Sequence, residues 1–143
     1  MEISMNLIKD LREKTGAGIS ECKKALDESV GDIEKAIEIL RKRGIAKAAK
    51  RGDRDTSEGI IKLAVNDLQN EGYIVELNAE TDFVTRSEKF QEFSDKILEI
   101  IKEKKIASLN DLLNENFENG TVKENLDNLS GVIGEKLTIK RCE

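Results

Sequence analysis

The sequence predicts an α+β fold in which a three-helix bundle, a linker and a two-layer domain follow one another along the chain. Three observations support this class. Apolar residues recur every three to four positions up to residue 44, they alternate with polar residues between residues 61 and 79, and helical spacing then returns before a short final alternation at residues 137–140. We therefore expect helices packed on a three-stranded antiparallel sheet.

The first 44 residues carry the pattern of three short amphipathic helices. An apolar face that includes Leu11 stops at Gly16, which can adopt the left-handed conformation that ends a helix. A second apolar stripe is broken at Gly31, and Asp32 is placed to cap a third helix that ends at Gly44. A bundle of this size is marginally stable unless it docks on another part of the chain.

Charge divides the chain into two parts. Residues 1–54 carry 13 basic and 10 acidic side chains, whereas residues 55–143 carry 11 basic and 19 acidic ones. Such a step in charge predicts a domain boundary. We therefore expect a helical module with a basic linker at residues 1–54 and an α+β core domain at residues 55–143.

The basic run at residues 41–54 has two interpretations. It can be a surface that binds nucleic acid or an acidic protein, or it can be a solvated helical linker with a basic face. No aromatic residue is interleaved to stack on bases, and the whole chain has a net charge of −5. These features favour the linker, and they place an acidic protein partner ahead of RNA.

The alternation at residues 61–79 predicts an antiparallel β-hairpin. Ile61, Leu63 and Val65 alternate with polar or small residues, a turn follows at residues 67–72, and a second alternating run begins at Tyr73. Alternation of this kind is typical of strands with one buried face. We expect the apolar residues of both runs to form that face.

Capping-box spacing, a hydroxyl residue followed three positions later by an acid, predicts where the remaining helices begin. A long helix is expected after the hairpin, then a short helix, and then a longer helix that ends at Gly134 before the last strand. The three spacings run from Thr85 to Glu88, from Ser108 to Asp111 and from Thr121 to Glu124.

The connection between the hairpin and the long helix, residues 80–84, places a phenylalanine beside an acid. Connections of this kind lie on the surface. Phe83 can therefore be a wedge for a partner. Alternatively, Asp82 or Thr81 caps a helix and Phe83 folds back on the core as a hydrophobic staple, which local physics favours because caps are common.

Several classes of function are excluded or disfavoured. The chain has no histidine, so imidazole acid–base catalysis, a Ser/His triad and histidine-ligated metal are excluded. Two cysteines make neither a disulfide framework nor a zinc site, and Cys22 lies on an apolar stripe as a small buried hydrophobe. No phosphate-binding glycine motif, signal peptide or membrane span is evident. We expect a soluble cytoplasmic protein that is not an enzyme and holds no cofactor or metal.

Three segments resemble the translation elongation factor Ts family. They are Leu-Arg-Glu-Lys-Thr-Gly-Ala-Gly at residues 11–18, Glu-Leu-Asn-Ala-Glu-Thr-Asp-Phe-Val at residues 76–84 and Ile-Gly-Glu-Lys-Leu-Thr-Ile-Lys-Arg at residues 133–141. The resemblance implies a three-helix module like a ubiquitin-associated (UBA) domain, a linker and a small α+β core. It also implies a guanine nucleotide exchange factor that binds elongation factor Tu with GDP, displaces Mg²⁺ and promotes GDP release during translation.

By this resemblance, two groups of residues contact the GTPase domain of elongation factor Tu. In the first, Phe83 wedges into the domain and Asp82 disturbs the network that holds Mg²⁺, and the group comprises Thr81, Asp82, Phe83 and Val84. The second belongs to the N-terminal module and comprises Leu11, Arg12, Thr15, Gly16, Ala17, Gly18, Cys22 and Lys23.

The chain departs from the family in length. Many members carry a second core subdomain or an insertion before the last strand, and here residues 106–130 form only a brief link. Short members work as homodimers, and the exposed edge of a three-stranded sheet gives a homodimer a physical motive. Cys142 would cross-link such a dimer or, as a reducing cytosol favours, remain a free thiol.

Two rival functions remain from the sequence. The helical module can serve a ubiquitin-like binding adaptor, and residues 41–54 can serve an RNA-associated factor, although no direct nucleic-acid contact is expected. The exchange-factor interpretation requires Phe83 on the binding surface, whereas the RNA interpretation predicts an affinity that falls steeply with salt.

Overall fold

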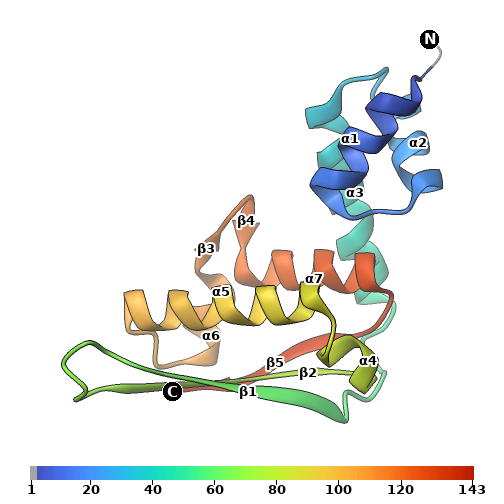
Figure 1. Cartoon of the computed structure of the whole chain (residues 1–143). Helices are drawn as coiled ribbons and strands as arrows, with labels where there is room; N and C mark the ends of the chain where they lie inside the picture. The colour runs from blue at the N-terminus through green and yellow to red at the C-terminus, as the bar shows by residue number, and fades with distance from the viewer. Residues whose placement is uncertain (1–2) are drawn as a thin grey trace.

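The computed structural model describes residues 3–143 and confirms the α+β class, with a three-stranded antiparallel sheet (Figure 1). A group of helices comes first, and a sheet covered by further helices follows. In chain order the elements are α1 (Met5–Thr15), α2 (Ile19–Glu28), α3 (Ile33–Ala49), β1 (Glu58–Val65), β2 (Gly72–Ala79), α4 (Asp82–Thr85), α5 (Glu88–Lys104), α6 (Leu109–Asn114), β3 (Asn116–Phe117), β4 (Gly120–Thr121), α7 (Val122–Ile133) and β5 (Leu137–Cys142).

The first two helices and the start of α3 enclose a small apolar cluster. α1 ends at Gly16, whose φ of 68° is left-handed as predicted, and Asp32 caps α3 by accepting a hydrogen bond from the Lys35 N–H at 3.1 Å. Cys22 is fully buried in this cluster, and burial raises the pKa of its thiol. The cluster comprises Ile8, Leu11, Ala17, Cys22, Ala25, Leu26, Ala36 and Leu40.

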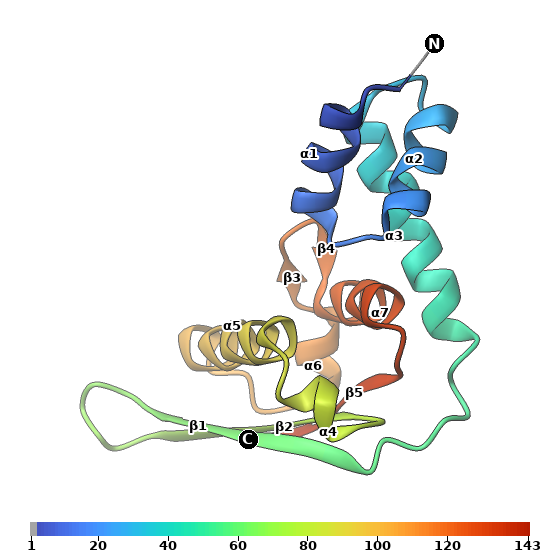
Figure 2. The ribbon, with the colours of Figure 1, turned by 45° about the vertical axis from the view of Figure 1, so that its right-hand side comes forward.

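The third helix is longer than predicted. It continues past Gly44 to Ala49, so Gly44 is an internal residue rather than a helix end. Its second half contains three alanines, which favour helix, and it packs along α7 (Figure 2). Most of the predicted linker is therefore a helix docked on the rest of the chain.

Two helix-interior glycines meet where α3 packs on α7. Glycine in a helix interior costs about 0.5–1 kcal/mol relative to alanine. Here the close approach of the two backbones requires it, because a Cβ atom on Gly131 would lie 2.5 Å from the Cα of Gly44. The predicted role of Gly44 as a helix terminator is therefore wrong, and its role is close packing.

The sheet has the strand order β1-β2-β5, with antiparallel pairing throughout. β1 and β2 form the predicted hairpin, and β5 pairs with the other side of β2 with a register shift between Glu76 and Leu77. α5 and α7 lie on the same face of the sheet (Figure 2). This gives the two-layer arrangement that the sequence predicts.

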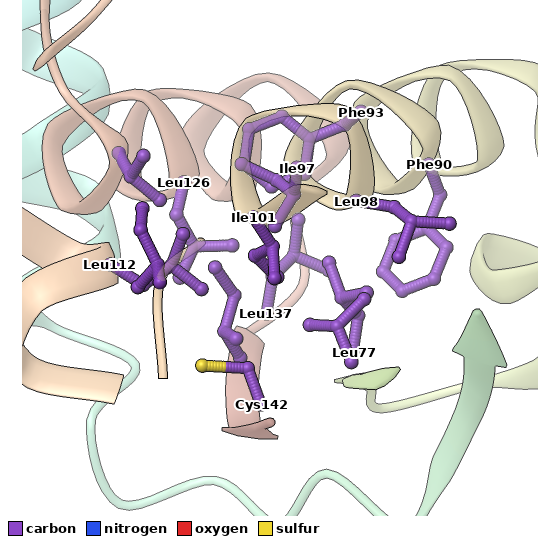
Figure 3. Close-up of a cluster of buried hydrophobic side chains, with 14 of the residues drawn as sticks. Leu77, Phe90, Phe93, Ile97, Leu98, Ile101, Leu112, Leu126, Leu137 and Cys142 are labelled. Carbon is purple, nitrogen blue, oxygen red and sulfur yellow. The ribbon is translucent and has the colours of Figure 1, made fainter. Parts of the chain in front are cut away.

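Aliphatic side chains and two phenylalanines fill the space between the sheet and the helices. Figure 3 shows Leu77 of β2 and Leu137 of β5 facing the side chains of α5, with Cys142 beside them. Cys142 is buried, and burial raises the pKa of its thiol. The fully or nearly fully buried side chains include Val75, Leu77, Phe90, Ile97, Ile101, Leu112 and Val122.

The buried face of β1 differs from the prediction. Residues directly opposite each other in an antiparallel pair share one face of the sheet. Tyr73 and Val75 of β2 are buried, and they lie opposite Ala64 and Lys62, so the intervening residues of β1 face outward. Ile61, Leu63 and Val65 accordingly lie on the outer face, where the Leu63 side chain is 70% exposed.

The segment before α7 contains a short β3–β4 hairpin that the sequence did not predict. Its Phe117 packs edge to face on Phe93 of α5, with ring centroids 6.1 Å apart. The hairpin leads into α7 through the predicted capping box, because Thr121 Oγ1 accepts from the Glu124 N–H and the Glu124 carboxylate accepts from the Thr121 N–H.

Of the other two predicted capping boxes, the one at Ser108 forms in part and the one at Thr85 does not form. Ser108 caps α6 by accepting a hydrogen bond from the Asp111 N–H at 3.1 Å. The box predicted from Thr85 to Glu88 is wrong, since α5 begins at Glu88 and its cap is Ser87. Thr85 instead lies inside the short helix α4, where its hydroxyl donates to the Asp82 carbonyl at 3.1 Å.

Candidate partner-binding site

The side chain of Phe83 stands outside its own domain. It lies on the single-turn helix α4, between β2 and α5, and is 85% exposed. The interpretation of Phe83 as a hydrophobic staple is therefore wrong. Its neighbour Asp82 does not fold back as a cap either, because its carboxylate pairs with Arg86 at 3.3 Å on the exposed side of the turn.

Two carboxylates fasten the start of this turn to the segment between α7 and β5. Glu135 accepts two hydrogen bonds from Thr81, one from its N–H at 3.0 Å and one from its hydroxyl at 2.7 Å. In return, Glu80 accepts a hydrogen bond from the Lys136 N–H at 2.6 Å. The two connecting segments therefore hold each other, and Phe83 projects from a fixed position.

The end of the turn is held by the core and by α5. Val84 packs against the core cluster, and Thr85 is buried. The Gln91 side chain donates a hydrogen bond to the Thr85 carbonyl at 2.6 Å, and the Ser87 hydroxyl donates to the Val84 carbonyl at 2.7 Å. Of the predicted group of residues 81–84, Phe83 and Asp82 thus face outward while Thr81 and Val84 hold the turn.

The predicted N-terminal group surrounds the loop at residues 15–18, which we call the 15–18 loop. The Thr15 hydroxyl donates to the Leu11 carbonyl at 2.7 Å and accepts from the Ala17 N–H at 3.3 Å. Leu11, Ala17 and Cys22 are buried, so they support the loop from within. The exposed members of the group are Arg12, Gly18 and Lys23, and Thr15 and Gly16 are half-buried.

The 15–18 loop lies beside the beginning of α5. A Cβ atom on Gly16 would come within 2.6 Å of the Lys89 ammonium and 3.4 Å of Val132 in α7. Lys89 is the second residue of α5, which starts directly after the turn that carries Phe83. The fold therefore places the 15–18 loop next to the start of α5.

The basic run at residues 41–54 finds much of its acidic complement within the chain. Arg41 pairs with Glu124, Arg43 with Glu28 and Lys47 with Glu21, and Arg54 lies 3.2 Å from Glu80. Arg51 donates a hydrogen bond to the Ser130 carbonyl at 3.3 Å. These contacts weaken the interpretation of the run as a surface that binds nucleic acid or an acidic protein.

The side chains at the site are an exposed aromatic ring and an acid on a turn braced by hydrogen bonds. Among residues 3–143, no three histidine, cysteine, aspartate or glutamate side chains are grouped closely enough to hold a metal ion. No helix in the same range is long and apolar enough to cross a membrane. What the site presents is an aromatic ring with an acid beside it on a braced turn, an arrangement suited to inserting into another protein.

Fold and site together define a small α+β protein that presents an exposed aromatic side chain and an acid on a braced turn. A family model described as "Elongation factor TS" matches residues 80–143, a range that begins with the segment that carries Phe83. The chain is 47% identical to "Elongation factor Ts" of Chloroherpeton thalassium over 144 residues, which covers 98% of this chain and 50% of that relative. The chain belongs to the elongation factor Ts family.

Two further relatives match in the same way. The proteins named "Elongation factor Ts" from Chlorobaculum tepidum and Prosthecochloris aestuarii are each 46% identical over 144 residues, again across 98% of this chain and 50% of the relative. The chain thus spans about half the length of the curated relatives it matches.

Sequence reasoning missed the residues that brace the site. Glu135 and Lys136 lie within a segment that resembles the family, but no local pattern connects them to Thr81 and Glu80. The partners are 54 and 56 residues apart in sequence. A glutamate directly after the helix-ending Gly134 was the one available signal, and it is too common to identify a brace.

Phe83→Ala should leave the free energy of unfolding within about 0.5 kcal/mol of wild type, because the ring packs on little of its own chain. The matched change Phe90→Ala removes a ring that is only 1% exposed and should cost about 3–5 kcal/mol. Urea unfolding followed by circular dichroism measures both. A loss of about 2 kcal/mol or more in Phe83→Ala would place that ring inside the fold, contrary to the structure.

The Lys136 N–H, and then the Arg54 guanidinium, hold the pKa of Glu80 below its ordinary value. A carboxylate with a lowered folded-state pKa stabilises the fold above its unfolded pKa of about 4.3, and this contribution is lost as the pH falls through the folded value. The Glu80→Gln variant should therefore lose less stability than wild type as the pH falls below about 4.3. Parallel acid profiles in urea unfolding would contradict this.

Proposed function

We propose that this chain acts as a guanine nucleotide exchange factor for elongation factor Tu and that Phe83 is the residue it inserts. The observation that carries the proposal is the exposure of the Phe83 ring on a turn held by hydrogen bonds on both sides. A preorganised aromatic anchor loses little entropy on binding and is typically worth 2 kcal/mol or more, roughly a thirtyfold change in affinity. Membership of the elongation factor Ts family supports the choice of partner.

In the proposed mechanism, the Phe83 ring separates elements of the GTPase domain and Asp82 enters the surroundings of its Mg²⁺. Asp82 is available because its pairing with Arg86 is exposed to solvent, where such pairs are weak. Displacing Mg²⁺ leaves the charge of the GDP diphosphate without its main counter-ion, so GDP leaves faster. No covalent bond is made or broken.

Coupling between the exchange factor and the nucleotide is reciprocal. A protein that weakens GDP binding to elongation factor Tu must itself bind more weakly when GDP is present. The proposed factor therefore accelerates exchange without selecting GTP over GDP. Selection would follow from the nucleotide concentrations around the complex.

The N-terminal helices are proposed to hold a second part of the same partner. We propose residues 1–54 as a UBA-like module and residues 55–143 as the core domain, and two separate buried clusters support that division. The exposed residues Arg12, Gly18 and Lys23 would contact the partner, while the buried Leu11, Ala17 and Cys22 keep the 15–18 loop in shape. We place this activity in the cytoplasm, where translation occurs.

Stopped-flow release of a fluorescent GDP from elongation factor Tu tests the proposed function. Wild type should accelerate release, Phe83→Ala should lose most of the acceleration because the anchor is gone, and Asp82→Ala should retain part of it. Leu68→Ala is the matched control, since Leu68 is 81% exposed on the distant β1–β2 turn.

An unchanged GDP off-rate with wild type would show that the chain is not an exchange factor by itself. Full activity in Phe83→Ala would remove the proposed anchor. If the chain instead bound RNA with a steep salt dependence, the RNA-associated adaptor would be the better function.

We further propose that the chain forms a homodimer through the outer face of its sheet. The support is an apolar surface formed by Ile61, Leu63, Val65 and Ile74, in which Leu63 and Ile74 lie directly opposite each other. A two-fold interface presents the same patch from both subunits, so this apolar patch would pack on its own copy in the second chain. Cys142 is buried in the core, which argues against the cross-link considered from the sequence.

Leu63→Lys should convert the proposed dimer to a monomer of 16.0 kDa, because it places a charge at the centre of the apolar face. Sedimentation velocity measures the mass. Met5→Lys is the control, since Met5 is equally an exposed apolar residue but lies on α1. A wild type that remains monomeric at every concentration would contradict the dimer.

A further inference from the structure

The N-terminal helices approach the core closely where α3 packs on α7 at two glycines. A Cβ atom on Gly131 would lie 2.5 Å from the Gly44 Cα and 2.8 Å from the Gly44 carbonyl oxygen. A Cβ atom on Gly44 would lie 3.2 Å from the Asn128 Cα and 3.3 Å from its carbonyl oxygen. These are backbone atoms, which cannot move aside as the end of a flexible side chain can.

An ion pair holds α3 to the start of α7, about one turn before Gly44 and about two turns before Gly131. The Arg41 guanidinium contacts the Glu124 carboxylate, the same group that accepts the Thr121 N–H at 3.0 Å and so begins α7. Gly120 makes room for this pair, because a Cβ atom there would lie 2.1 Å from Arg41 Nη2 and 2.0 Å from Glu124 Oε2. One carboxylate thus serves both the start of α7 and the docking of α3.

A third contact lies near the end of α7. Arg51, just after α3, donates a hydrogen bond to the Ser130 carbonyl at 3.3 Å. The partners of Arg41, Gly44 and Arg51 therefore extend from Glu124 to Gly131, about two turns of α7. A docking of this length resists both sliding and rotation of α3.

The crossing connects the two groups of residues proposed to contact the partner. On one side, α3 belongs to the helical cluster that supports the 15–18 loop. On the other side, α7 leads directly to Glu135 and Lys136, which hold the turn that carries Phe83. A change in how α3 sits on α7 must therefore change the spacing between Phe83 and the 15–18 loop.

We propose that the Gly44–Gly131 crossing fixes this spacing, so that both groups contact one partner molecule at the same time. The proposal rests on the proposed function. Two linked contacts reinforce each other only when their spacing matches the two places on the partner, and their combined affinity is lost when it does not. Gly44 and Gly131 are positioning residues in this scheme, and neither contacts the partner.

Gly131→Ala tests the proposal because its methyl group must push α3 away from α7. In the GDP-release assay, the concentration of the chain that gives half of the maximal rate should rise by about tenfold, since binding through two linked contacts is impaired. The maximal rate at saturation should stay within about twofold of wild type, because Phe83 is unchanged. The matched control is Gly52→Ala, where the nearest atom to an added Cβ is 3.5 Å away.

Amide hydrogen exchange provides a readout that does not depend on the partner. Alanine is a better helix former than glycine, so propensity alone predicts slower exchange in Gly131→Ala. The proposal predicts the opposite for the amides of residues 41–49, with the amides of β2 unchanged. Arg41→Met, which removes the ion pair but adds no clash, should shift half-saturation and exchange in the same direction by a smaller factor.

Each outcome is decisive. Unchanged exchange in α3 together with unchanged half-saturation in Gly131→Ala would overturn the proposal. Faster exchange in α3 with unchanged half-saturation would also overturn it, because the spacing would then not matter for binding. If wild type fails to accelerate GDP release, the proposed function itself is wrong and this inference falls with it, whereas failure of the variant prediction alone leaves the function intact.

Discussion

The hydrogen bonds exchanged by two connecting segments are the interaction on which the presentation of Phe83 depends. Glu135 binds the N–H and hydroxyl of Thr81, and Glu80 binds the N–H of Lys136. Backbone donors outside helices and strands need partners, and carboxylates satisfy them strongly. Because each segment supplies the acceptor for the other, the turn after β2 and the turn after α7 are positioned together. The Phe83 ring is therefore held in solvent by the contacts of its neighbours, although the ring itself is 85% exposed.

The contact between the helical part and the core likewise depends on a few residues. Gly44 and Gly131 are poor choices for helix propensity, and their position is explained only by the two backbones that they allow to approach. Glu124 closes a capping box and also receives Arg41. These features look local in sequence, but they make contacts with residues far away in the chain. The apolar cluster of the helical bundle is small, so the bundle gains stability by docking on the core.

Local signals predicted most of the fold. The ends at Gly16 and Gly134, the cap at Asp32 and the capping box at Thr121 depend only on neighbouring residues, and all were confirmed. The outward face of β1 and the continuation of α3 past Gly44 were not predictable, because strand pairing and contact with α7 decide them.

For the candidate site, the exposed position of Phe83 was one of two alternatives that the sequence left open. The braces from Glu135 and Lys136 could not be foreseen, since their partners lie more than 50 residues away.

The two buried cysteines have a practical consequence. Cys22 sits in the helical cluster and Cys142 in the core of the sheet, and thiols react as thiolates, which need access to water. The rate of alkylation at each sulfur therefore reports how often its own part of the molecule opens, so the two cysteines measure opening separately in the helical cluster and in the core.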